Sequence, residues 1–115
     1  MLQISSSTRI FVCVQLVDFR KGIDGLAAVC RNKLDQDPFQ GTVFVFRNRG
    51  KTIIRLLVYD GQGFWLCTKR LSKGTFGWWP KDSSVITARQ IQTLLWNGNP
   101  DAANFSDNWK SIAVQ

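Results

Sequence analysis

Three apolar segments follow one another between residues 42 and 69, and only short loops separate them. They are rich in valine, isoleucine and aromatic residues, which is typical of strands, and they span Thr42–Phe46, Thr52–Tyr59 and Phe64–Lys69. The second loop is Asp60-Gly61-Gln62-Gly63, in which Asp-Gly favours a hairpin because glycine accepts positive φ. Because loops this short join antiparallel neighbours, the segments predict a β-meander.

A strand and a helix are expected before this meander. The segment Arg9–Val17 is rich in β-branched and aromatic residues, which predicts a strand. Asp18 is a favoured N-cap residue, so we expect a helix that begins near Arg20. Apolar residues recur at helical spacing after it, at Ile23, Leu26, Ala27, Cys30 and Leu34.

A further strand and a second helix are expected after the meander. An edge strand is predicted over Thr75–Trp79, where Pro80 would stop it. Thr87 and Gln90 have the spacing of a capping box, and Gly98 is expected to end the helix. Its apolar face is predicted to consist of Ile91, Leu94 and Leu95.

The sequence predicts a single α+β domain over residues 1–96 and a loosely structured C-terminal tail over residues 97–115. The domain is expected to hold an antiparallel sheet of four or five strands with two packed helices. A chain of 115 residues buries roughly two thirds of its unfolded surface, and 44% hydrophobic residues can supply that core. No apolar run approaches the ~20 residues that would span a bilayer, so no membrane contact is expected.

The three cysteines, Cys13, Cys30 and Cys67, form no closely spaced pair. We expect reduced thiols in a cytoplasmic protein, since disulfides form in oxidising compartments. Secretion with one unpaired thiol is the alternative.

The positive charge of the chain is concentrated in its central segment. The formal net charge is +7. Between Pro38 and Lys81 a single acid, Asp60, stands against eight basic residues: Arg47, Arg49, Lys51, Arg55, Lys69, Arg70, Lys73 and Lys81. One positive surface implies an anionic partner, and nucleic acid is the favoured one.

The first loop of the meander contains most of the candidate nucleic-acid contacts. It is Arg47-Asn48-Arg49-Gly50-Lys51, and its cations would face phosphates or guanine edges if the two-stranded ribbon entered the major groove. Its alternative interpretation is an ordinary solvated turn. Further candidates on the same surface are Arg55, Lys69, Arg70 and Lys73.

Four residues are candidates for contact with a partner protein: Arg20, Lys21, Trp78 and Trp79. The adjacent tryptophans cannot both point inward if they lie on a strand, so one is expected to face a partner or another copy of the chain. Stacking on unpaired bases is a second possibility for the aromatic residues, and core packing is the default.

Catalysis by this chain is not expected. It has no histidine and no glutamate, so aspartate, cysteine or lysine would have to act as base, metal ligand and nucleophile. Asp18, Asp24 and Asp60 each fit a structural role, at a helix cap, a first helical turn and a hairpin. We therefore expect no catalytic residue, metal site, cofactor or small-molecule substrate.

The sequence resembles one known family in four blocks. They are Asp18-Phe19-Arg20-Lys21-Gly22-Ile23-Asp24-Gly25-Leu26, Asp37-Pro38-Phe39-Gln40-Gly41, Val43-Phe44-Val45-Phe46-Arg47-Asn48-Arg49, and Asp60-Gly61-Gln62-Gly63-Phe64-Trp65-Leu66 continuing to Lys69-Arg70-Leu71. This pattern is similar to the second open reading frame of insertion-sequence-66 type elements, the TnpB-type accessory proteins. Phe19 departs from that pattern, in which methionine is usual, and the sequence is irregular after Trp96.

The resemblance implies a role in bacterial DNA transposition, in which a separate transposase performs the cutting and joining. The implied partners are DNA, in particular transposon ends, and that transposase. The alternative is an adaptor whose basic face docks on the transposase without direct contact with DNA. The oligomeric state remains open.

Overall fold

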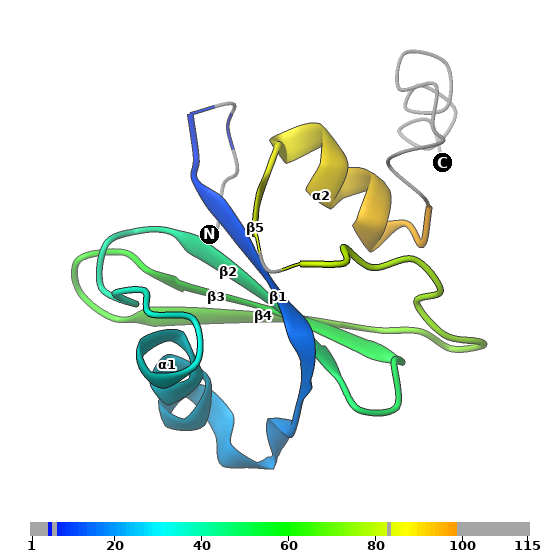
Figure 1. The fold of residues 1–115 in the computed structure, drawn as a ribbon, viewed down its shortest axis with the longest axis horizontal. Helices are drawn as coiled ribbons and strands as arrows, with labels where there is room; N and C mark the ends of the chain where they lie inside the picture. Colours follow the sequence, from blue (N-terminus) through cyan, green and yellow to red (C-terminus); the bar gives the residue numbers. More distant parts are fainter. Residues whose placement is uncertain (1–4, 6, 83, 99–115) are drawn as a thin grey trace.

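The computed structural model describes residue 5, residues 7–82 and residues 84–98 (Figure 1). In these ranges the elements are β1 (Ile10–Val17), a 3₁₀ turn η1 (Phe19–Lys21), α1 (Gly22–Asn32), β2 (Val43–Asn48), β3 (Ile53–Tyr59), β4 (Phe64–Arg70), β5 (Ser84–Ile86) and α2 (Ala88–Leu95). No helix in the described ranges is long and apolar enough to cross a membrane.

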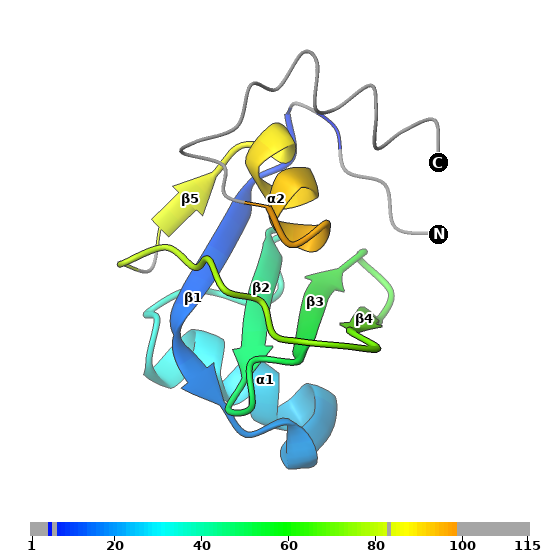
Figure 2. The ribbon, with the colours of Figure 1, turned by 90° about the vertical axis from the view of Figure 1, so that its right-hand side faces the viewer.

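The five strands form one mixed sheet in the order β4-β3-β2-β1-β5. β1 pairs with β2 in parallel, and the other three neighbouring pairs are antiparallel. The helices α1 and α2 lie on opposite faces of the sheet (Figures 1 and 2). The predicted α+β class with two packed helices is confirmed. The sheet was expected to be antiparallel, and it is so except for the parallel pair of β1 and β2.

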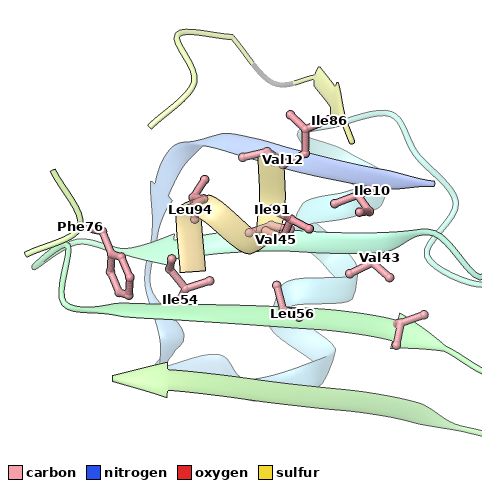
Figure 3. Packing of buried hydrophobic residues seen from close by; sticks show 11 residues of the cluster. Ile10, Val12, Val43, Val45, Ile54, Leu56, Phe76, Ile86, Ile91 and Leu94 are labelled. Atoms are coloured by element: carbon pink, nitrogen blue, oxygen red, sulfur yellow. The ribbon is translucent and has the colours of Figure 1, made fainter. Parts of the chain in front are cut away.

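Strand alternation divides the core into two layers. On β2, Val43 and Val45 pack on the α2 side, whereas Phe44 and Phe46 pack on the α1 side. Figure 3 shows the α2 layer, in which Ile91 and Leu94 lie over the sheet. The α1 layer also contains Cys13, Val17, Leu26, Ala27, Cys30 and Leu57.

Both ends of α2 have well-defined caps. The Thr87 hydroxyl accepts the Gln90 N–H, and the Gln90 side chain accepts the Thr87 N–H, which confirms the predicted capping box. At the other end Asn97 takes the left-handed conformation (φ 61°), and the Gly98 N–H donates to the Thr93 carbonyl. The helix thus ends in a Schellman motif whose left-handed residue is Asn97, one residue before the predicted stop.

The start of the first helix differs from the prediction. Asp18 does accept the Arg20 N–H, but it caps η1, and α1 begins at Gly22. Gly22 has a φ of +65°, a conformation that glycine adopts without strain, and it separates the two helical segments.

The predicted edge strand over Thr75–Trp79 is wrong. Residues 71–82 instead cross the α2 side of the sheet from β4 to β5, which is the edge strand beside β1 (Figure 2). Backbone bonds from Leu71 to Thr52 and from Phe76 to Lys51 connect this crossing loop to the hairpin between β2 and β3. The tail predicted from residue 97 lies outside the described residues from residue 99 onward.

Candidate nucleic-acid interface

One end of the sheet brings together cations from three separate parts of the chain. β1, β2 and β4 all end there, and β3 begins there, because Val17 pairs with Asn48 and Ile53 pairs with Arg70. The exposed cations at or just beyond these strand ends are Arg20, Lys21, Arg49, Lys51, Arg70 and Lys73. We call these six residues the basic end.

The hairpin between β2 and β3 presents two of these cations on an ordered loop. The Asn48 side-chain oxygen accepts the backbone N–H groups of Thr52 (2.9 Å) and Ile53 (3.0 Å). Lys51 has a φ of +61° and donates its N–H to the Asn48 carbonyl. Arg49 and Lys51 project from this loop as exposed residues, as the sequence predicts.

Arg47 is not available at the hairpin tip, where the sequence analysis placed it. It lies within β2, is only 8% exposed and is covered by the crossing loop. Its Nη1 donates to the Phe76 carbonyl at 3.0 Å, and its guanidinium lies 4.6 Å from the centre of the Trp79 ring. Burial lowers the pKa of Arg47 from its usual value. Arg47 is therefore an interior residue, since it lies under the crossing loop on the α2 side of the sheet and not at the solvent surface.

Arg55 lies on the opposite face of the sheet. Its Nη1 donates to the Phe19 carbonyl at 3.1 Å, and its guanidinium lies 4.7 Å from the centre of the Phe19 ring. The Nε atom is buried and has no hydrogen-bond partner among the described residues. Arg55 thus contacts η1 through neutral groups.

A hollow of about 370 Å³ lies between η1 and the β2–β3 hairpin. Its wall includes Asp18, Arg20, Arg49 and Arg55. Arg20 donates to both oxygens of Asp18, with Nη2 at 2.8 Å, and these bonds lower the pKa of Asp18 to about 2. Arg20 was predicted as a partner contact, and the fold places it beside the candidate nucleic-acid residues.

The cations in and after β4 lie in two different places. The Lys69 Nζ donates to the Leu95 carbonyl at the end of α2 and lies 4.7 Å from the centre of the Trp96 ring. A cation at that position stabilises the helix C-terminus. Arg70 and Lys73 are exposed and belong to the basic end, whereas Lys69 is held on the α2 side of the sheet.

Comparison with known proteins identifies the family. The family model described as IS66 Orf2 like protein matches residues 8–103, which include the whole of the basic end. The chain belongs to the IS66 Orf2-like family. Members of this family are accessory proteins of insertion sequences, so the chain is associated with transposition.

Two relatives come from Sinorhizobium fredii (strain NBRC 101917 / NGR234). The protein named y4jC is 39% identical over 92 residues, which cover 79% of each chain. The protein named y4hO is 29% identical over 114 residues, which cover 99% of each chain. No solved structure matches this IS66 Orf2-like chain.

The adjacent tryptophans Trp78 and Trp79 of this IS66 Orf2-like chain do not lie on a strand, contrary to the prediction. Both are half-buried and pack against the α2 layer of the core. Trp79 also donates its Nε1–H to the Cys13 carbonyl at 2.8 Å. Because they lie in the crossing loop and not on a strand, the rule that one must face outward does not apply.

Three of the groups considered for catalysis, Asp60, Cys13 and Cys30, take part in the hydrogen bonding or the core of the fold. Asp60 accepts the N–H groups of Gln62 and Gly63 and the Nε1–H of Trp65, which keeps its pKa below the usual value. Burial raises the pKa of the Cys13 thiol and raises that of Cys30 to about 12, which disfavours the thiolate that a nucleophile or metal ligand requires. Among the described residues, no group of three histidine, cysteine or acidic side chains is placed to hold a metal ion.

Proposed function

We propose that this protein is a non-catalytic accessory factor of insertion-sequence transposition that binds DNA through its basic end and assists a separate transposase. One observation supports this above the others: six exposed cations from three parts of the chain lie at one end of the sheet. Such a concentration of positive charge attracts the phosphate backbone.

The shape of the basic end suits a duplex. The β2–β3 hairpin presents Arg49 and Lys51 at its tip, between the ends of β1 and β4, where both cations could contact the phosphate backbone. Arg70 and Lys73 follow the neighbouring strand, where they would contact the flanking phosphates. Contacts of this kind fix the orientation of a protein on DNA and leave sequence readout to a few tip residues.

The non-catalytic part of the proposal follows from the available side chains. The chain lacks histidine and glutamate. Asp18 and Asp60 are occupied by hydrogen bonds within the fold, and the Cys13 and Cys30 thiols are buried. The cutting and joining chemistry therefore falls to the transposase, and we place both proteins in the cytoplasm with the DNA.

A duplex-binding titration with charge-matched variants tests this function. We expect the triple variant Arg49→Gln, Lys51→Gln, Arg70→Gln to lose roughly 100-fold in affinity at 100 mM salt, because three phosphate contacts disappear. The matched control removes three exposed cations elsewhere: Arg9→Gln, Arg31→Gln and Arg89→Gln. Fluorescence anisotropy on element ends, unrelated duplex and single strands measures both.

The control triple should bind almost as the native protein does. Equal losses in the two triples would mean that net charge and not the basic end determines binding. If the protein instead bound no DNA at low salt and bound the transposase in a salt-sensitive way, the partner of this surface would be an acidic patch of the transposase and not DNA.

A further inference from the structure

The guanidinium of Arg55 is a half-buried positive charge without an anionic partner in the described part of the chain. Its one hydrogen bond there goes to the neutral carbonyl of Phe19, and its Nε is buried and unpaired. An ionised group removed from water is costly unless an opposite charge or further hydrogen bonds compensate it. A bound anion would therefore stabilise the charge of Arg55.

The neighbouring carboxylate does not supply that anion. Asp18 lines the same hollow, but both of its oxygens accept hydrogen bonds from Arg20. Asp18 is the one acid beside Arg20, Arg49 and Arg55 on the wall of the hollow, so it cannot neutralise all three arginines. The local field in the hollow is therefore positive although an acid is present.

We propose that this hollow binds one phosphate group of the bound DNA backbone. Arg55 supplies a fixed guanidinium from β3, and Arg49 supplies an exposed one from the hairpin tip. Guanidinium groups present several N–H donors in a plane that matches phosphate oxygens. This inference rests on the proposed function, and it names a site at the edge of the basic end where one phosphate is held more firmly than the others.

The geometry of Arg55 makes it a suitable anchor. Its position on β3 is fixed by pairing with Phe46 on one side and Thr68 on the other. Its guanidinium is oriented by the Phe19 carbonyl and ring. A donor that is already immobilised loses little conformational entropy on binding, unlike a flexible surface lysine.

The test combines a charge-preserving variant with a direct signal. Arg55→Lys keeps the positive charge but removes the planar fork, so we expect about a tenfold loss of duplex affinity from this variant. Arg49→Lys, at the exposed rim, should weaken binding in the same direction without affecting folding. Arg31→Gln, at an exposed arginine of α1 that does not line the hollow, is the control and should bind as the native protein does.

The direct signal is the Arg55 Nε–H resonance in ¹⁵N-edited NMR. We expect this resonance to shift when duplex DNA without 5′-phosphates is added. Inorganic phosphate alone should shift it more weakly. A duplex with 5′-phosphates should behave like the one without them, because the site takes a backbone diester and not a strand end.

Four results would overturn the inference in distinguishable ways. Normal salt-dependent DNA binding with an unmoved Arg55 resonance and a native-like Arg55→Lys variant would remove this site and leave the proposed function intact. A shift with inorganic phosphate only, with no duplex binding, would overturn both. If the shift required 5′-phosphorylated DNA, the ligand of the hollow would be the phosphate at a strand end and not a backbone phosphate. An Arg55→Lys variant that loses stability but keeps native affinity would make Arg55 a support for η1 alone.

Discussion

Replacing Arg47 by alanine tests whether this residue belongs to the interior or to the DNA-binding surface. The change removes a charged hydrogen bond to the Phe76 carbonyl, worth about 1.5–3 kcal/mol, and a cation–π contact with Trp79, worth about 0.5–2 kcal/mol. Relief of the buried charge offsets part of this loss. The net destabilisation should be about 1–3 kcal/mol.

Chemical and thermal unfolding measure this effect. For a chain of this size, each kcal/mol corresponds to roughly 3–6 °C in Tm, so Arg47→Ala should unfold roughly 3–18 °C below the native protein. Arg49→Ala, two residues further on but exposed, should change stability by less than about 0.5 kcal/mol. Arg47→Met should recover part of the loss because the apolar stem still packs under the crossing loop.

DNA affinity measured on the same variants completes the test. Folded Arg47→Ala should bind duplex DNA with near-native affinity, whereas Arg49→Ala should bind more weakly. If Arg47→Ala were as stable as the native protein and lost affinity like Arg49→Ala, the Arg47 side chain would have to lie at the surface. The assignment of the interior role would then be wrong.

Four further predictions follow from the same structure. If four to six cations neutralise phosphates, duplex affinity should fall by roughly 10²–10³ between 50 and 200 mM salt, and a flat response would contradict DNA binding. Stability should fall as the pH drops from about 4 towards 2, because Asp18 and Asp60 have lowered pKa values in the folded protein. The unfolded chain therefore binds more protons than the folded one in that range, and urea midpoints at each pH measure the loss. Thr87→Ala should lower stability by about 1 kcal/mol, while Thr87→Ser should not, because only the hydroxyl caps α2. Asp18→Asn should stay folded and support transposition in cells with the complete element; a stable variant that abolishes transposition would contradict a non-catalytic role.

The local features of the fold were predictable because they depend on neighbouring residues. The capping box at Thr87 and the Asp60 hairpin involve groups within a few positions of each other, so their chemistry is visible in the sequence. The same holds for the exposure of Arg49 and Lys51, which lie in a loop between two strands. Charge and turn chemistry located the loop but started it two residues too early, since β2 continues through Arg47 to Asn48.

The burial of Arg47 was not predictable from its neighbours. Its position next to a cationic loop indicates a surface residue, and the segment that covers it begins more than 20 residues later. The crossing loop has no repeating pattern of its own, and the apolar residues in Thr75–Trp79 resemble a strand. Only the position of β5 on the far side of β1 requires the chain to cross the sheet at this point.

The parallel pairing of β1 and β2 determines the composition of the basic end. In a parallel pair both strands finish at the same end of the sheet, so the residues after Val17 lie next to the hairpin after Asn48. Antiparallel pairing would have placed Arg20 at the opposite end, near Thr42, and the hollow between η1 and the hairpin would not exist. The sequence shows which segments carry cations. These segments come together only because β1 pairs with β2, two strands that α1 separates in the chain. A change that weakened the β1–β2 pair would therefore separate Arg20 and Asp18 from Arg49 and Arg55 without altering any of these four side chains.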